Sequence, residues 1–241
     1  QARVVTCSSP EQLAALVQGW AGEVTLVLSE PGVDFQNPNG VQRSYNSTLL
    51  AVPDAWRTAA DTADATGALC SVAHLVVWAA APVMAGWLDA LPSSVHLAVL
   101  QVYEHQSSNC STVVAACPES LGALMLLSPC LTGLPESMGQ LTALKTLDLR
   151  SCNSLKGLPE SLGQLAALTT LDLCDCGLLT GLPESMGQLA TLRTLCLSDC
   201  RSLTGLPESI GQLKALVMLG LYSCNSLTGL PESMGQLAAL T

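Results

Sequence analysis

The hydrophobic positions in the second half of the chain repeat with a fixed period. From Leu134 the unit Leu-Pro-Glu-Ser-(Met/Leu/Ile)-Gly-Gln-Leu recurs every 24 residues, beginning again at Leu158, Leu182, Leu206 and Leu230. Each unit runs on into the pattern L-x-x-L-x-L-x-x-C-x-x-L, formed in the first copy by Leu144, Leu147, Leu149, Cys152 and Leu155. Self-similarity at such a period predicts a solenoid of stacked structural units.

The alternation within each unit predicts a short β-strand. Leu147 and Leu149 are two residues apart, so a strand places both side chains on one face and Asp148 on the other. One strand cannot bury its leucine face alone, whereas stacked copies pair in parallel, about 4.8 Å apart, over a continuous leucine core. We expect Gly157 to allow a tight corner and Pro159, with its fixed φ, to open an extended or short helical segment.

These repeats are similar to leucine-rich repeats, because four copies each keep six or more framework residues. The resemblance implies an α/β-type solenoid: a leucine-rich repeat horseshoe with a parallel β-sheet on the concave face and mostly irregular or short helical convex segments. The C-x-x-L ending is similar to plant-type repeats. Where the family often has Asn, this chain has a ladder of cysteines, which we expect to be buried reduced thiols that hydrogen-bond backbone groups. The ladder comprises Cys152, Cys176, Cys200 and Cys224.

The first half carries the same pattern in a degraded form. Leu97, Leu100 and Val102 match the strand pattern, with His105 at the ladder position. The weaker matches are Leu75, Trp78 and Ala80, and the pairs Leu26/Leu28 and Leu50/Val52. We therefore expect irregular, degenerate leucine-rich repeats over 23–130, with a separate small cap domain as the alternative, and regular repeats over 131–241.

The two ends of the predicted solenoid differ. Ser9 and Pro10 suit the start of a helix, and apolar residues then recur at helical spacing, so residues 1–22 are expected to hold an N-terminal capping helix. The last copy is expected to expose its leucines. The sequence therefore predicts that the C-terminal end is covered by a continuation of the chain or by another chain.

Charge and motif content exclude several functions. The net charge of −10, from 9 basic and 19 acidic residues, argues against nucleic-acid binding and against anionic membrane surfaces. The apolar run 75–88 is too short for a membrane helix and contains Pro82. No motif pairs a nucleophile with a base, so we expect neither enzyme activity nor a cofactor. Cys174 and Cys176 are expected to lie on different faces, so no metal site is predicted.

The outward strand positions vary among the copies, whereas the convex motif scarcely changes. A varied strip on a constant framework is typical of a recognition surface, and in the family resembled the concave sheet is the usual binding face; drift at unconstrained positions is the alternative. The expected partner-binding residues are Lys145, Asp148, Arg150, Asp172, Cys174, Asp175, Arg193, Cys196, Ser198, Asp199 and Tyr222. Within this set Cys174 and Cys196 are expected to be diagonal neighbours about 7–8 Å apart, too far for an unstrained disulfide. The repeated convex glutamates are expected to form a solvated acidic row.

The features that bear on compartment disagree. Asn46 and Asn109 are glycosylation acceptors in form. Five cysteines lie outside the ladder and can pair, for instance Cys110 with Cys117; the full set is Cys7, Cys70, Cys110, Cys117 and Cys130. An oxidising compartment would use these cysteines as staples, so an extracellular or secretory-pathway location is favoured. The ladder of thiols and the plant-type resemblance favour the cytoplasm instead.

The sequence thus predicts a non-catalytic recognition module that binds a protein, or a glycan, through its concave face. A structural or assembly subunit of a larger complex, or part of a longer receptor chain, is the alternative. Joint charge reversal at Asp172, Asp175 and Asp199 is expected to weaken partner binding with little change in the melting temperature.

Overall fold

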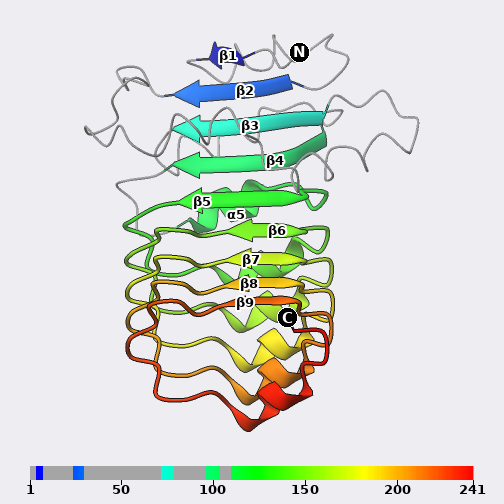
Figure 1. Cartoon of the computed structure of the whole chain (residues 1–241). Coiled ribbons are helices and arrows are strands. Elements are labelled where there is room, and N and C mark those ends of the chain that lie inside the picture. Colours follow the sequence, from blue (N-terminus) through cyan, green and yellow to red (C-terminus); the bar gives the residue numbers. More distant parts are fainter. Residues whose placement is uncertain (1–3, 8–23, 30–71, 79–95, 104–109, 241) are drawn as a thin grey trace.

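The computed structural model describes residues 4–7, 24–29, 72–78, 96–103 and 110–240. Its strands form one nine-stranded sheet in which every neighbouring pair is parallel and the spatial order follows the sequence (Figure 1). The strands are β1 (Val4–Cys7), β2 (Val24–Ser29), β3 (Val72–Trp78), β4 (His96–Tyr103), β5 (Ala123–Leu127), β6 (Thr146–Asp148), β7 (Thr170–Asp172), β8 (Thr194–Cys196) and β9 (Met218–Gly220). Such a topology is that of a solenoid in which each unit adds one strand.

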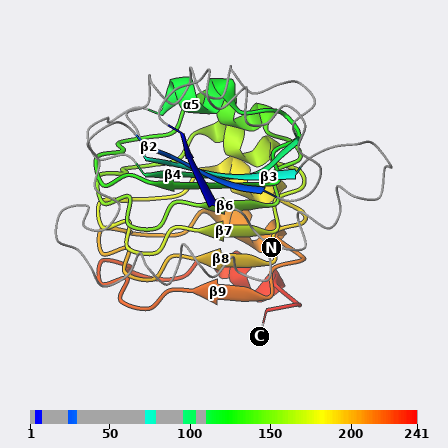
Figure 2. The same cartoon turned by 90° about the horizontal axis from the view of Figure 1, so that it is seen from above.

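Short helices form the side opposite the sheet (Figure 2). Each begins after the proline of the repeated motif, whose extended backbone (φ −72° and ψ 154° at Pro159) starts the segment as expected. The 3-10 helices are η2 (Glu136–Gln140), η3 (Glu160–Gln164), η4 (Glu184–Gln188), η5 (Glu208–Gln212) and η6 (Glu232–Gln236), and a single α-helix, α5 (Ser111–Ala116), precedes them among the described residues. The prediction of short helical convex segments is confirmed.

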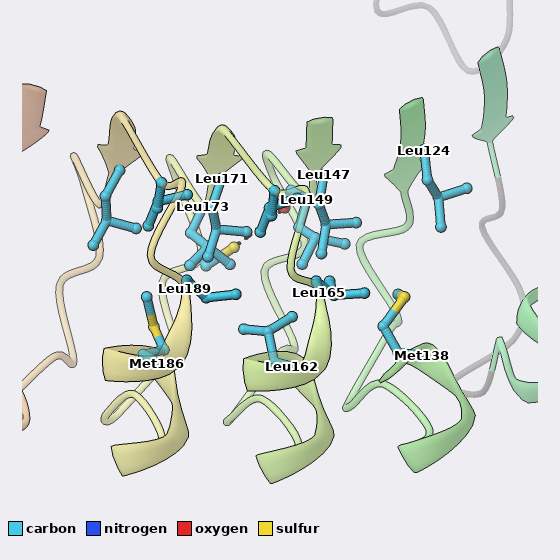
Figure 3. Close-up of a cluster of buried hydrophobic side chains, with 14 of the residues drawn as sticks. Leu124, Met138, Leu147, Leu149, Leu162, Leu165, Leu171, Leu173, Met186 and Leu189 are labelled. Atoms are coloured by element: carbon cyan, nitrogen blue, oxygen red, sulfur yellow. Dashed lines mark hydrogen bonds between the residues drawn. The ribbon is translucent and has the colours of Figure 1, made fainter. Parts of the chain in front are cut away.

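The core lies between these two layers. Leu147 and Leu149 point inward from the strand side and are fully buried, as are Leu171 and Leu173 one unit further on. From the other side Met138, Leu162 and Met186 of the 3-10 helices point toward these leucines (Figure 3). Each unit therefore buries its own leucines between its strand and its 3-10 helix. These side chains also pack against those of the neighbouring units, as the leucine pattern predicts.

Three of the four ladder cysteines are fully buried free thiols, as expected, and Cys224 in the last strand's unit is a partly buried one. The thiol of Cys176 donates to the carbonyl of Leu149 in the preceding unit at 3.2 Å, and that of Cys200 donates to Leu173 at 3.1 Å. Cys152 bonds Leu126 in the same way at 3.1 Å, and these three side chains are fully buried free thiols. The carbonyl groups of Leu149 and Leu173 also accept a backbone N–H, at 3.2 Å from Cys152 and from Cys176, so each of these thiols adds a second hydrogen bond to its acceptor.

The corner prediction for Gly157 is wrong, because no geometry at that position requires glycine. A Cβ at Gly157 would meet no atom within 4 Å, and the φ of this residue lies outside the left-handed range. The left-handed conformation occurs instead just after each strand, at Ser151, Asp175, Asp199 and Ser223, with φ between 58° and 61°. The steric need for glycine is at Gly163, where a Cβ would lie 2.5 Å from the carbonyl oxygen of Ser185.

The convex glutamates do more than face the solvent. Glu136 accepts a hydrogen bond from the backbone N–H of Ser161 at 3.1 Å, one unit further along. Glu160 does the same for Ser185, and Glu184 for Ser209, also at 3.1 Å. The expected solvated acidic row therefore also supplies bonds that tie η2, η3 and η4 each to the start of the next 3-10 helix.

Strands β2 to β4 extend the sheet into the first half of the chain. Leu26, Leu75, Leu100, Leu124 and Leu147 are consecutive partners across the sheet. This confirms the strand at Leu100. The predicted register of β3 is wrong by three residues, because Leu75, and not Trp78, is the residue in line with Leu100 and Leu147 across the sheet. The single sheet favours one solenoid over a separate cap domain, and the boundaries at 22 and 130 remain predictions.

Strand β1 was not predicted, and it lies within the region expected to hold the capping helix. The helix itself, the Leu50/Val52 pair, Ala80 and His105 fall outside the described residues. In the part of the chain that the structure describes, no helix has the length and apolar character needed to cross a bilayer.

Candidate functional site

The side chains at alternate positions of β6 to β9 face away from the leucine core. Asp148, Asp172, Cys196 and Gly220 are partners across the four strands. The residues two positions further along the chain lie on the same face, because the leucine between each pair is buried, as Leu149 is between Asp148 and Arg150. These residues are Arg150, Cys174, Ser198 and Tyr222. We call these eight residues the concave strip. It contains seven of the predicted partner-binding positions.

Asp148 faces outward as expected, but it is covered. Arg150 binds its carboxylate through two nitrogens at 2.8 and 3.0 Å, and only 4% of the residue is exposed. Burial raises the pKa of Asp148, and the hydrogen bonds and charge of Arg150 oppose that rise. Asp148 is therefore held as half of an ion pair, and Arg150, whose side chain is 40% exposed, is the member of the pair that a partner can reach.

Asp172 joins this ion pair to the next unit. One carboxylate oxygen accepts the backbone N–H of Cys174 at 3.0 Å, and the other lies 3.6 Å from Nε of Arg150. Asp148 makes the equivalent bond to the N–H of Arg150 at 3.1 Å. A carboxylate at this position thus caps the turn that follows its own strand, a role that sequence analysis missed.

Cys174 and Cys196 are free thiols, but their side chains lie closer together than the predicted diagonal spacing suggests. Their sulfur atoms and a carboxylate oxygen of Asp172 all lie within 4.8 Å of one another, and all three residues are partly exposed. Burial, together with hydrogen bonds to Cys196 and Asp172, raises the pKa of the Cys174 thiol. Cys176 belongs to the buried ladder, as predicted. The strip therefore contains a set of metal-ligating side chains that the sequence interpretation had dismissed.

Two other predicted residues have a conformational role. Asp175 and Asp199 occupy the left-handed position after their strands, where aspartate is tolerated better than most residues. Asp175 accepts a hydrogen bond from the Ser151 hydroxyl at 3.3 Å, and Asp199 lies 3.7 Å from Arg201. The left-handed backbone conformation therefore favours aspartate at these two positions, independently of any contact with a partner.

The remaining predicted residues lie at the borders of the strip or outside the described chain. The carbonyl groups of Lys145 and Arg193, just before their strands, accept backbone N–H bonds from the next unit, at 2.8 Å to Thr169 and to Val217 respectively. Arg193 is exposed, and Tyr222 is 78% exposed. The glycosylation acceptors Asn46 and Asn109 fall outside the described residues.

The cysteines at the two ends of α5 do not form the disulfide suggested by the sequence. Cys110 and Cys117 are buried free thiols, and Cys117 donates to the carbonyl of Val113 at 3.2 Å. Burial raises the pKa of Cys110 to about 11 and that of Cys117 to about 12. Cys130 likewise forms no disulfide with any described residue, while Cys70 and the side chain of Cys7 lie outside the description.

Taken together, the parallel sheet, the leucine core and the inward ladder define a leucine-rich repeat solenoid. Residues 143–165, 167–189 and 191–213 match the family model described as Leucine Rich Repeat. Residues 143–213 therefore carry three leucine-rich repeats, which are generally a non-catalytic fold of protein-interaction modules. The plant-type subclass stays a prediction. No curated protein matches the chain.

Several solved structures are similar to the chain. A Leptospira interrogans LRR protein, LIC12759, is 25% identical over 65% of this chain and 49% of its own, with a TM-score of 0.36. The leucine-rich repeat domain of the type III effector XopL is 21% identical over 84% of this chain and 83% of its own, also with a TM-score of 0.36. The Arabidopsis receptor kinase HAESA, in complex with the peptide hormone IDA and the co-receptor SERK1, is 24% identical over 70% of this chain and 28% of its own, with a TM-score of 0.46. This chain thus spans about half the length of the first of these proteins.

Proposed function

We propose that this protein is a non-catalytic interaction module that binds a protein partner through its concave strip. The observation that carries the proposal is the contrast between two sets of repeated positions. The convex glycine and glutamate recur because packing and hydrogen bonds between units demand them, as at Gly163 and Glu160. No such demand explains why one strip position reads Arg150, Cys174, Ser198 and Tyr222 in successive units.

The strip favours a protein partner of mixed polarity. Arg150 offers a partly exposed guanidinium whose fixed geometry suits a carboxylate, and Tyr222 offers a large exposed ring. These two groups lie three strands apart, so one partner surface of ordinary size can contact both. A glycan, usually held on aromatic rings, finds only Tyr222 among the strip residues, so we favour a protein.

The test must spare the residues that shape the backbone. Reversing Asp172, Asp175 and Asp199 together would disturb a turn cap and two left-handed positions, so loss of binding would be ambiguous. Tyr222→Ala changes an exposed side chain of the strip instead, and Arg150→Ala is made together with Asp148→Asn so that no buried carboxylate loses its cation. Leu178→Ala is the matched control, because Leu178 is 48% exposed but lies outside the strip.

The experiment captures a partner by photo-crosslinking and then measures its affinity. A photoreactive phenylalanine analogue replaces Tyr222 in one sample and Leu178 in another, in an extract of the source cells. The proposal expects a specific crosslinked protein from the Tyr222 sample alone. It also expects Arg150→Ala made together with Asp148→Asn, or Tyr222→Ala alone, to weaken the purified partner's binding by about 1–2 kcal/mol, or roughly 5- to 30-fold. Equal affinity of all three variants for that partner would overturn the assignment of the strip.

Two finer proposals from the sequence have tests of their own. An assembly subunit predicts stable self-association or a stoichiometric complex, which sedimentation of the native protein measures. The extracellular location predicts a mass above 25.0 kDa that falls on deglycosylation, with Asn46 and Asn109 as the modified residues. An unmodified mass with all 11 cysteines open to alkylation would support the cytoplasm instead.

A further inference from the structure

The concave strip holds a three-residue cluster that partner binding alone does not explain. Asp172 and Cys196 are direct partners across β7 and β8, and Cys174 lies two residues beyond Asp172 on the same face. One carboxylate oxygen and the two sulfur atoms all lie within 4.8 Å of one another. Among the described residues this is the one such group of three metal-ligating side chains.

We propose that Asp172, Cys174 and Cys196 bind a borderline-soft divalent metal ion, of which Zn²⁺ is the representative. Two thiolates and one carboxylate are ligand types that zinc accepts, and thiolate sulfur disfavours Mg²⁺ and Ca²⁺. Three protein ligands leave the fourth tetrahedral position to water or to another molecule. The proposal does not rest on the proposed function, since metal binding is measured without a partner.

The distances are close to those of an occupied site. In a tetrahedral zinc centre, bond lengths of about 2.0–2.3 Å place neighbouring ligand atoms roughly 3.5–3.8 Å apart. The three atoms here need to approach by at most about 1 Å to reach that spacing. Side-chain rotations of two cysteines and one aspartate on a fixed sheet can supply this change without a shift of the backbone.

The surroundings suit an ion as well. Asp172 is oriented by the N–H of Cys174 at 3.0 Å and by Arg150, whose Nε lies 3.6 Å from its second oxygen. Two thiolates and a carboxylate around a divalent cation leave a net charge of −1, which the Arg150 guanidinium, already paired with Asp148, offsets in part. Groups that orient and neutralise the ligands in this way are the usual outer shell of a metal site.

Gly220 keeps one side of the cluster open. A Cβ at this position would lie 3.1 Å from the sulfur of Cys196 and 3.2 Å from the hydroxyl of Ser198. The neighbouring units carry Asp148, Asp172 and Cys196 at the same register position. Of these four units, the one with glycine at this register position is the one beside the cluster, where a larger side chain would crowd the Cys196 thiol.

The two thiols also differ from the fully buried ladder cysteines in a way that suits binding. Cys174 and Cys196 are partly exposed, whereas the ladder thiols of Cys152, Cys176 and Cys200 are fully buried and already bond carbonyl groups. An ion from solution can therefore reach the cluster. Because a thiol must lose its proton to ligate a metal ion, binding should release protons and strengthen as the pH rises.

The test titrates the full reduced chain with Co²⁺, a spectroscopic probe of zinc sites, and then displaces it with Zn²⁺. The proposal expects one tight ion per chain, with the visible bands of tetrahedral cobalt and a sulfur-to-cobalt charge-transfer band. It also expects about two protons released per ion. Cys174→Ser and Cys196→Ser should each weaken binding by about 100-fold or more, and Asp172→Asn by at least about 10-fold.

Two control variants remove the same kinds of groups outside the cluster. Cys224→Ser deletes a partly buried ladder thiol, and Asp175→Asn deletes a carboxylate while keeping a residue that tolerates the left-handed backbone. Both should bind within about 2-fold of the unmodified chain. The proposal fails if the cobalt spectrum lacks tetrahedral sulfur ligation, or if Cys224→Ser reduces binding as much as Cys174→Ser does. It also fails if the Cys174→Ser and Cys196→Ser chains keep their melting temperatures and their full metal affinity.

Discussion

Single residues in each unit are selected by their contacts with the next unit. The glycine of the Pro-Glu-Ser-x-Gly-Gln motif lies against the backbone of the following serine. A Cβ at Gly163 would approach the Ser185 carbonyl to 2.5 Å, and one at Gly187 would approach Ser209 to 2.8 Å. The glycine before each Leu-Pro, such as Gly157, meets nothing within 4 Å. Two glycines that recur equally in the sequence therefore have unequal roles.

We expect Gly163→Ala to destabilise the protein and Gly157→Ala to leave it unchanged or slightly more stable. The first change forces a methyl group into backbone atoms, which costs about 1–3 kcal/mol. The second fills open space and restricts the unfolded chain, which gains about 0.4–1 kcal/mol. The midpoints of urea unfolding, followed by circular dichroism, measure both changes. Equal midpoints for the two variants would show that the units do not pack as closely as described.

The period and the alternation of leucines were enough to predict β6 to β9, the buried leucines and the inward cysteines of the regular units, but not β1 or the register of β3. They could not distinguish Gly157 from Gly163, because both glycines recur in every unit and only their spatial neighbours differ.

The metal-ligating cluster was missed for a related reason. The predicted spacing of Cys174 and Cys196 considered the backbone alone, whereas the side chains on this face bring the two sulfur atoms and a carboxylate oxygen of Asp172 to within 4.8 Å of one another. The sequence did contain one indication of the cluster, because Asp172 and Cys174 are two residues apart and so lie on the same face as Cys196.

At the scale of elements, the units are joined by ladders that run along the sheet and along the 3-10 helices. The cysteine ladder bonds each turn to the strand before it, and the glutamates bond each 3-10 helix to the next. Threonines add a third series, in which Thr204 donates to the carbonyl of Thr180 at 3.1 Å and Thr228 donates to Thr204 at 3.1 Å. These bonds all cross unit boundaries, so they contribute to coupling between units rather than to the fold of one unit.

The cysteine ladder makes stability fall in alkaline solution. Burial raises the pKa of Cys152 and of Cys200 to about 12, from an ordinary value of 9.0. Below pH 9 these thiols are protonated in both states, so their contribution is fully present. As the pH rises from about 9 toward 12, the unfolded chain loses thiol protons that the folded chain retains, and the free energy of unfolding decreases.

Replacing one ladder thiol isolates this effect from the titration of lysine and tyrosine. Cys200→Ser keeps a donor for the Leu173 carbonyl but removes the ionisable thiol. We expect the loss of stability between about pH 9 and 11 to be smaller in this variant than in the unmodified chain. Urea midpoints at each pH give the comparison. Parallel curves for the two proteins would mean that the buried thiol does not govern the alkaline slope.

The glutamate bonds are tested by comparing two positions of the same motif. Glu160 accepts the N–H of Ser185, whereas Glu232 makes no such bond among the described residues. Glu160→Ala should therefore lower the free energy of unfolding by about 0.5–1 kcal/mol, because an N–H at a helix start loses its acceptor. Glu232→Ala should have no measurable effect, and Glu160→Gln, which keeps an oxygen acceptor, should lie between them. Thermal unfolding of the three variants separates these outcomes.

At the scale of the whole molecule, stability is carried by contacts between neighbours along one axis. Each strand pairs with the one before it and the one after it, and no strand of the described sheet pairs out of order. In such a chain of units, a defect in the middle separates two groups that otherwise support each other, whereas a defect in the last unit affects its own surroundings. The position of a mutation along the axis therefore matters as much as its burial.

The leucines of β7 and β9 test this dependence on position. Leu171 is fully buried between two strands, and Leu219 is partly exposed in the last one. Leu171→Ala should cost about 2–5 kcal/mol, and Leu219→Ala clearly less. Hydrogen exchange read by mass spectrometry should show faster exchange on both sides of β7 for the first variant, from β6 through β8, but only around β9 for the second. If Leu171→Ala instead accelerated exchange equally along the whole described chain, the solenoid would unfold as one cooperative body, and its units could not be treated as separately coupled elements.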